Sequence, residues 1–169
     1  LIIGLSFSFS QQIQRDKVLI EIGTGTWCQY CPGSAMGADD MVANGHDVVI
    51  IENHNGDSYT NTASNARNSY YNISGYPTTV FDGGSAYVGG SNTTSLYPQY
   101  LQRYNQKITV PTSFSMEVEG TSSGFVDFNV NVTIEMVVPY TGSDIRLHCA
   151  ITESDIQETW QGQSHLNFV

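Results

Sequence analysis

The sequence predicts an α/β domain followed by a β-rich segment. Over the first hundred residues, short apolar runs typical of strands alternate with segments of helical spacing, and after residue 107 only strand-like alternation remains. Strands separated by helices usually pair in parallel, so the first part should contain a central sheet flanked by helices. The chain has 169 residues and is 40% hydrophobic, which is enough apolar material to bury a core.

Four short strands are predicted in the first part. They cover Val18–Ile22, Val48–Ile51, Thr78–Phe81 and Ala86–Val88. The second of these is a continuous apolar run, which is typical of a strand buried on both faces. The last two are separated by the turn residues Asp82-Gly83-Gly84, which predicts an antiparallel hairpin at the edge of the sheet.

Three helices are predicted between and after these strands. Apolar and aromatic residues recur at helical spacing in segments 35–42, 60–71 and 96–104. Pro98 falls near the start of the third segment, where a helix tolerates proline. The expected order is strand, helix, strand, helix, two strands and a final helix.

The β-rich segment contains three stretches of strand-like alternation, at 113–119, 125–138 and 145–152. In the second stretch, the apolar residues from Val126 to Met136 all share one parity and polar residues separate them. About sixty residues supply three or four strands, fewer than the roughly seven of a complete immunoglobulin-like sandwich. We therefore expect a β-rich domain over 108–169 that is truncated at its C-terminus, after an α/β domain over 11–107.

The first ten residues predict export of the protein. Leu1–Ser10 is an apolar run too short to span a bilayer, and small residues occupy the -3 and -1 positions of a cleavage site after Ser10. We interpret this segment as the remnant of a signal peptide, with an edge strand as the alternative. Export places the protein in the periplasm, on the outer membrane surface or outside the cell, where disulfides persist. No transmembrane span is expected.

The charge balance excludes two classes of partner. The chain contains six Lys and Arg residues and 16 Asp and Glu residues, which gives a net charge of -10. Nucleic-acid binding requires a basic face, and docking on anionic lipid requires clustered Lys or Arg. The sequence therefore predicts neither activity.

Cys28 and Cys31 form the motif with the most specific chemical meaning. A C-x-x-C between a buried strand and a helix is typical of a redox site. We expect Cys28 at the start of the helix, where the positive end of the helix dipole stabilises a thiolate, and Cys31 as the resolving residue. Trp27 would form an apolar flank. Cys149 lies in an apolar run and is expected to be a buried small hydrophobe.

Two other interpretations of this motif stay open. A zinc half-site would need further ligands at matching spacing, and the four histidines are scattered, so we expect no metal and no cofactor. A permanent Cys28–Cys31 disulfide without turnover is the stronger alternative.

Tyr76, Pro77 and Thr78 form a second candidate element at the start of the third strand. A proline in this position can adopt a cis bond and leave the backbone of Tyr76 to pair with an extended partner. The alternative is an ordinary proline at a strand start.

Together these features resemble the thioredoxin superfamily. The resemblance is carried by the motif at 27–31, the turn at 76–78 and the element order between them, and it covers Lys17–Lys107. It implies a thioredoxin-like sandwich, with a central mixed sheet flanked by helices, and a cis bond between Tyr76 and Pro77.

The chain is also similar to the bacterial outer membrane protein 28-related family, in which a thioredoxin-like domain precedes a β-rich domain. The matching segments are Val18–Glu21, Thr24–Cys28, Tyr30–Pro32 and Gly75–Gly83. This likeness implies a location in the cell envelope and does not establish an activity.

Glu21 is the acid nearest to the cysteines in the preceding strand. Thioredoxins often have a buried carboxylate beneath the resolving cysteine, so the resemblance implies a role as proton acceptor. Glu21 lies seven residues before Cys28, one more than usual, and a shift of one residue moves a side chain to the other face of a strand. Glu21 is therefore either a proton acceptor or a satisfied polar group.

The sequence thus predicts an exported thiol–disulfide oxidoreductase acting on protein dithiols or disulfides. Cys28 and Cys31 would be catalytic, and the substrate would contact Trp27 and the segment Tyr76–Thr78. The alternative is a cell-envelope binding or adhesion protein in which the α/β domain is a scaffold with a structural disulfide. The two differ in one observable property, because an active Cys28 sulfur must be reachable.

Overall fold

The chain divides into two compact units. The computed structural model describes residues 11–124, 127–160 and 163–167, so the predicted signal-peptide remnant at 1–10 lies outside the described residues. The larger unit comprises Asp16–Thr109 and the chain from His148 onward, and the smaller unit comprises Val110–Leu147 with the segment up to Arg15. This grouping differs from the predicted domain over 108–169, because the residues after Leu147 join the α/β unit.

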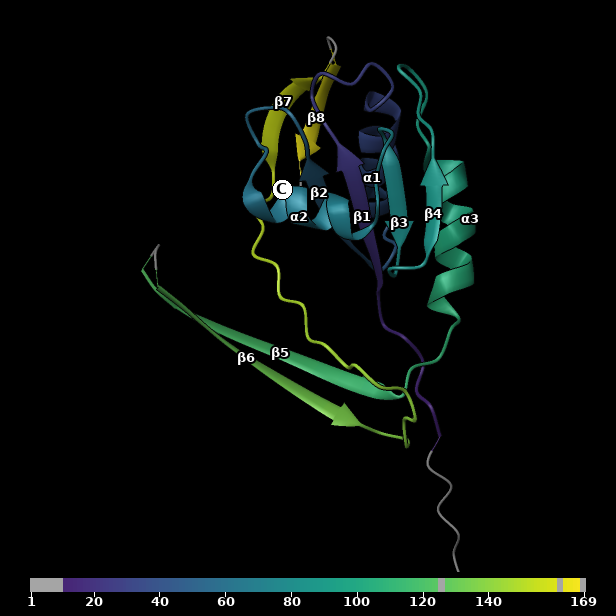
Figure 1. Cartoon of the computed structure of the whole chain (residues 1–169), viewed down its shortest axis with the longest axis vertical. Coiled ribbons are helices and arrows are strands. Elements are labelled where there is room, and N and C mark those ends of the chain that lie inside the picture. Colours follow the sequence, from purple (N-terminus) through teal and green to yellow (C-terminus); the bar gives the residue numbers. More distant parts are fainter. Residues whose placement is uncertain (1–10, 125–126, 161–162, 168–169) are drawn as a thin grey trace, which may run out of the picture. The chain divides into compact units, whose positions relative to one another are not determined.

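A four-stranded mixed sheet forms the centre of the larger unit (Figure 1). Its strands are β1 (Val18–Thr24), β2 (Val48–His54), β3 (Thr78–Phe81) and β4 (Ser85–Val88). They are ordered β2-β1-β3-β4, with β1 and β2 parallel and the remaining neighbours antiparallel. The predicted α/β class and the predicted edge hairpin are both confirmed.

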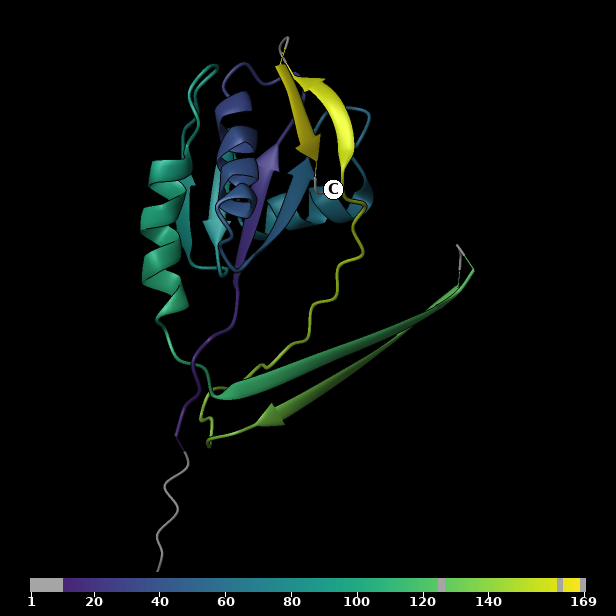
Figure 2. The same ribbon diagram turned by 180° about the vertical axis from the view of Figure 1, so that it is seen from behind.

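Three helices cover the two faces of this sheet. They are α1 (Pro32–Ala43), α2 (Thr62–Tyr70) and α3 (Tyr97–Ile108). Figures 1 and 2 show α2 on one face, and α1 with α3 on the opposite face. Pro32 occupies the first turn of α1. Backbone N–H groups in this turn have no acceptor within the helix, so a proline there costs no hydrogen bond. Among the described residues, no helix is both long enough and apolar enough to cross a membrane.

The main core lies between the sheet and the pair α1 and α3. Val18, Ile20 and Ile22 project from β1 into this layer and are fully buried. Because side chains alternate along a strand, the intervening Glu21 projects toward α2. The hydroxyl of Tyr100 shares hydrogen bonds of 2.5 Å with Ser34 Oγ and 2.6 Å with Thr79 Oγ1, which ties α3 to α1 and β3.

Strand β2 differs from its prediction. The run Val48–Ile51 was expected to be buried on both faces, but β2 is an edge strand and Val49 is 44% exposed. An apolar run predicts a strand without specifying its place in the sheet, because the strand order depends on pairing between distant segments.

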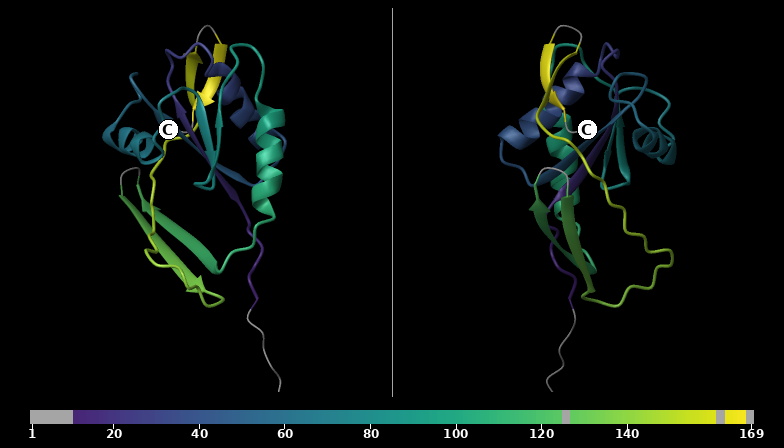
Figure 3. Two further views of the ribbon diagram at one scale, coloured as in Figure 1. Left: turned by 45° about the vertical axis from the view of Figure 1, so that its right-hand side comes forward. Right: turned by 90° about the vertical axis from the view of Figure 1, so that its left-hand side faces the viewer.

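The β-rich segment forms two separate hairpins. Strands β5 (Phe114–Ser123) and β6 (Asp127–Met136) pair in the smaller unit, and β7 (Ile156–Trp160) pairs with β8 (Gln163–Asn167) in the larger unit (Figure 3). The prediction of a third strand-like stretch at 145–152 is wrong, because these residues form no strand.

Candidate functional site

The two cysteines of the motif form a disulfide in the connection between β1 and α1. The Cα atoms of Cys28 and Cys31 are 5.3 Å apart. Two successive turns precede the helix, since the Cys28 N–H donates to Gly25 O at 2.9 Å and the Cys31 N–H donates to Cys28 O at 3.2 Å. Cys31 is the N-cap of α1. The prediction that Cys28 begins the helix is therefore wrong, and the end of the helix dipole lies at Cys31.

The disulfide is almost completely buried. Cys28 is 4% exposed and Cys31 is not exposed at all. Both belong to a small apolar cluster with Ala35 and the fully buried Trp160, and Tyr76 packs against this cluster. Hence this conformation does not present the reachable Cys28 sulfur that an active site requires.

Trp27 lies beside the disulfide turn and remains half exposed. Its indole N–H donates to Asn55 O at 2.5 Å, which joins the connection after β1 to the loop after β2. Its ring meets the ring of Tyr76 edge-on, with centroids 5.7 Å apart. The structure thus brings together two of the residues predicted to contact a substrate.

Pro77 also lies next to the disulfide turn, and the Tyr76–Pro77 peptide bond is cis, as the resemblance implied. A loop connects the two features, because the Ser91 N–H donates to Tyr30 O at 2.9 Å and the Gly89 N–H donates to Pro77 O at 3.1 Å. Between them, a methyl group at Gly90 would overlap Tyr30 O and lie 2.8 Å from the Pro77 ring.

The side chain of Thr78, at the start of β3, forms a hydrogen bond within the preceding turn. Its hydroxyl donates to Gly75 O at 2.7 Å, so this side chain braces the turn that carries Pro77.

Glu21 lies on the opposite face of the sheet from α1. Arg67 of α2 donates to both carboxylate oxygens, from Nε at 2.5 Å and from Nη2 at 2.7 Å, and the Tyr71 hydroxyl donates at 2.5 Å. The hydrogen bond to Glu21 raises the pKa of Arg67, whereas burial and the same carboxylate raise the pKa of Tyr71. This environment favours the interpretation of Glu21 as a satisfied polar group.

A buried group of charged residues that sequence analysis did not select extends from the end of β2. The His54 Nδ1–H donates to the Asp57 carboxylate at 2.6 Å, and His54 Nε2 lies 3.8 Å from Glu52 Oε2. Burial lowers the pKa of His54, but hydrogen bonds and attraction from Glu52 and Asp57 outweigh it, so the pKa is raised overall. Asp57 also accepts the Thr26 N–H at 2.9 Å and thereby contacts the turn before Cys28.

The available signal for this group was its position. His54 follows a strand of the predicted sheet at its carboxyl end, where sites cluster in α/β folds. The sequence did not indicate that Glu52 and His54 continue the buried parity of Ile50.

Trp160 of β7 is a further residue that sequence analysis missed. Its ring meets the ring of His54 edge-on at 5.3 Å, so it lies between the His54 group and the disulfide cluster. Residue 160 belongs to the segment predicted to form a separate β-rich domain, and a sequence pattern carries no signal for such a distant contact.

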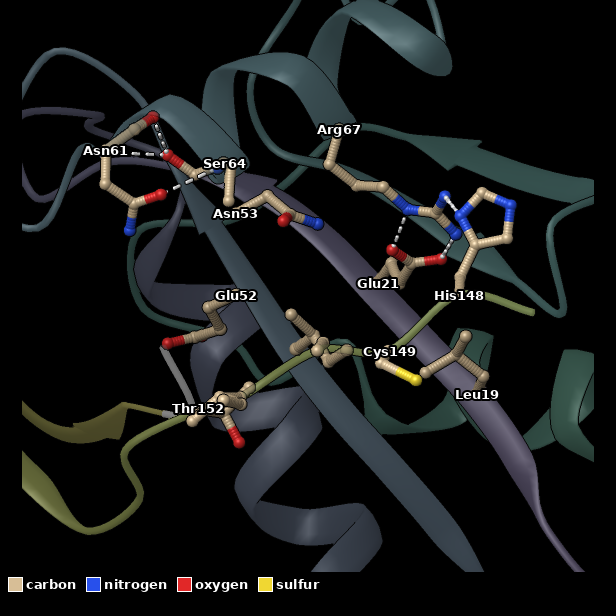
Figure 4. A pocket seen from close by; sticks show the side chains of 14 residues that line it. Leu19, Glu21, Glu52, Asn53, Asn61, Ser64, Arg67, His148, Cys149 and Thr152 are labelled. Atoms are coloured by element: carbon tan, nitrogen blue, oxygen red, sulfur yellow. Dashed lines mark hydrogen bonds and ion pairs between the residues drawn. The ribbon is translucent and has the colours of Figure 1, made fainter. Parts of the chain in front are cut away.

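A separate pocket of about 470 Å³ lies on the α2 side of the larger unit (Figure 4). Arg67 Nη1 lies 3.4 Å from His148 Nδ1 in this pocket, and the buried Asn53 Nδ2 has no hydrogen-bond partner among the residues that the structure describes. Cys149 lines this pocket and is exposed, which corrects its prediction as a buried residue. Apolar and polar side chains line the pocket in similar numbers, and this mixture does not select a class of ligand. They come from Leu19, Glu21, Ile51, Glu52, Asn53, Asn61, Ala63, Ser64, Arg67, His148, Cys149, Ala150, Ile151 and Thr152.

Comparisons of the chain with protein-family models, curated proteins and solved structures find no match. The function must therefore be argued from the chemistry of the site. Within the part of the chain that the structure describes, no group of His, Cys, Asp and Glu side chains could hold a metal ion. The chemistry that the site offers is the exchange chemistry of two neighbouring sulfurs.

Proposed function

We propose that the protein is an exported thiol–disulfide oxidoreductase with a thioredoxin-like domain, acting on protein dithiols or disulfides. The observation that carries this proposal is the Cys28–Cys31 pair between β1 and α1, with Pro77 held against the same turn by the Gly89–Ser91 loop. The strand order β2-β1-β3-β4 and the cis bond before Pro77 support the thioredoxin-like assignment.

The proposed reaction moves two electrons and needs no cofactor. A thiolate of a protein dithiol attacks the Cys28 sulfur, the Cys28–Cys31 bond breaks, and Cys31 leaves as a thiolate. The second thiolate of the partner then attacks its own sulfur in the mixed disulfide and releases Cys28. The partner is oxidised to a disulfide, the Cys28–Cys31 pair is reduced, and the partner's two protons pass to the released thiolates or to solvent. Reduction of a partner disulfide is the same sequence in reverse.

Turnover tests the proposal directly. With dithiothreitol as electron donor and a fluorescence-quenched disulfide peptide as substrate, the wild-type protein should accelerate substrate reduction. Cys28→Ser should reduce the rate to that of dithiothreitol alone. Cys149→Ser is the matched control, because it removes the thiol outside the disulfide and should leave the rate unchanged.

A trapping variant adds a second readout. Cys31→Ser cannot resolve a mixed disulfide, so it should accumulate a covalent adduct with the peptide that a reductant releases. If wild type and Cys28→Ser act at equal rates and no adduct forms, the protein does not catalyse exchange.

A structural disulfide in a binding scaffold is the second candidate, and the burial of both cysteines favours it. Equilibration with glutathione buffers separates the two functions. A reduction potential below about −300 mV is typical of a structural disulfide, whereas a higher potential is typical of a catalytic one.

Export is part of the same proposal. An oxidising compartment keeps such a disulfide formed, and other proteins of the cell envelope are the partners that it would meet there. Fractionation of cells that express the full-length precursor should recover the protein outside the cytoplasm, and recovery in the cytoplasmic fraction would contradict this assignment.

A further inference from the structure

The β7–β8 hairpin covers the Cys28–Cys31 disulfide. Trp160, the last residue of β7, is fully buried in the same cluster as both cysteines. Strand β8 continues from it and lies against α1, the helix that begins at the disulfide (Figure 2). The low exposure of Cys28 therefore depends in part on a chain segment more than 120 residues away in sequence.

Two contacts, one from the last residue of β2 and one from the loop that follows it, hold the hairpin in this position. The ring of His54 packs edge-on against Trp160, and the Tyr59 hydroxyl donates a 2.6 Å hydrogen bond to Glu158 Oε2. The hydrogen bond to Glu158 raises the pKa of Tyr59 to about 12. Trp160 thus provides the apolar contact of the hairpin with the disulfide cluster. The hydrogen bond between Tyr59 and Glu158, here called the latch, provides a polar contact.

Strand β8 packs against α1, but within the described residues the hairpin shares no hydrogen-bond ladder with the central sheet. Strands β7 and β8 form their hydrogen-bond ladder with each other and not with the four-stranded sheet. The preceding residues 137–155 contain neither helix nor strand. A hairpin that shares no hydrogen-bond ladder with the central sheet can detach locally while the rest of the fold stays intact.

We propose that the β7–β8 hairpin is a cap that controls access to the Cys28–Cys31 disulfide, and that thiols react with the disulfide after the hairpin detaches. Trp160 closes the site, and the Tyr59–Glu158 hydrogen bond sets how often it opens. The cap controls this access whether or not a protein is the reaction partner, so it does not depend on the proposed turnover.

The rate of disulfide reduction under native conditions tests the cap. The oxidised protein is mixed with dithiothreitol, quenched at intervals, and labelled with a maleimide–polyethylene glycol that reports newly formed thiols on a gel. Trp160→Ala should accelerate reduction by at least about tenfold, because truncation of a buried tryptophan removes most of the contact energy that keeps the cap closed. Thr159→Ala is the matched control, since this neighbouring side chain is exposed, and it should reduce at the wild-type rate.

Tyr59→Phe provides a second variant that leaves the buried cluster intact. It removes the hydroxyl of the latch and should accelerate reduction by about fivefold, the effect of one hydrogen bond. This variant also serves if Trp160→Ala does not fold.

A urea series separates cap opening from global unfolding. If the cap detaches locally, the wild-type rate should rise much less steeply with urea than the equilibrium constant for unfolding, because local opening exposes less surface. Unchanged rates in Trp160→Ala and Tyr59→Phe would overturn the proposal. A wild-type rate that follows the full unfolding slope would overturn it as well.

Discussion

Glu21 and Arg67 form a two-point ion pair on the α2 face of the sheet, with nitrogen–oxygen distances of 2.5 and 2.7 Å. The Glu21 side chain is 3% exposed and the Arg67 side chain 23% exposed, so the pair is shielded from solvent. The pair joins β1 to α2. It also holds the Glu21 carboxylate on the α2 face, away from the two cysteines, which lie at the α1 face.

Loss of Arg67 should destabilise the protein strongly. Arg67→Met leaves the buried Glu21 carboxylate without its cation, which should cost about 3 kcal/mol of unfolding free energy in a urea titration. The double variant Glu21→Gln/Arg67→Met should recover part of this loss, because no unpaired charge remains. An Arg67→Met protein as stable as wild type would contradict the role of this ion pair.

Glu21→Gln should leave the chemistry of the cysteines unchanged. Since Glu21 projects from β1 toward α2, its charge should not influence the thiolate that forms at Cys28 after reduction. The pH profile of iodoacetamide alkylation in the reduced protein should therefore coincide with that of wild type. A profile displaced by this substitution would restore Glu21 as a proton acceptor.

Stability should fall as the pH rises above 6.5. The pKa of His54 is raised above its ordinary value of 6.5 in the folded protein, so folding favours the protonated ring. Its contribution is fully present below pH 6.5 and is lost as the pH rises through the folded pKa. Urea titrations across this window should show the decline, and His54→Gln should flatten it. A decline of unaltered size in that variant would assign the effect to another group.

Gly90→Ala should destabilise the loop that joins Pro77 to the disulfide turn. The added methyl group would overlap Tyr30 O, which is main-chain oxygen and cannot rotate away, so we expect a loss of about 1–3 kcal/mol. Gly75→Ala is the control, because its methyl group would meet open space. Thermal unfolding should separate the two variants, and equal melting temperatures would mean that the close approach at Gly90 has little effect on stability.

Cys149 should be the site of labelling in the oxidised protein. It is exposed, whereas Cys28 and Cys31 are joined in a disulfide. Without reductant, intact mass should show a single maleimide adduct on the native chain, and Cys149→Ser should show none. Labelling of Cys149→Ser would indicate that the disulfide is incomplete in solution.

Local patterns were sufficient for much of the fold. Short apolar runs predicted the four strands of the sheet, helical spacing predicted the three helices, and the turn at Asp82–Gly84 predicted the edge hairpin. The motif predicted the Cys28–Cys31 pair, and the resemblance predicted the cis bond at Pro77. Each of these features depends on residues close together in the chain or on a short motif.

For the central sheet and its helices, the sequence by itself determined which segments are strands and helices, and it determined which two sulfurs can meet, because backbone propensity and short-range geometry decide both. Tertiary structure alone decided that β2 is an edge strand, that Glu21 pairs with Arg67, and that Trp160 covers the disulfide. These outcomes follow from pairing and packing between segments that are distant in the chain. A period of two along a strand separates its two faces without specifying which helix, or which remote tryptophan, each face will meet.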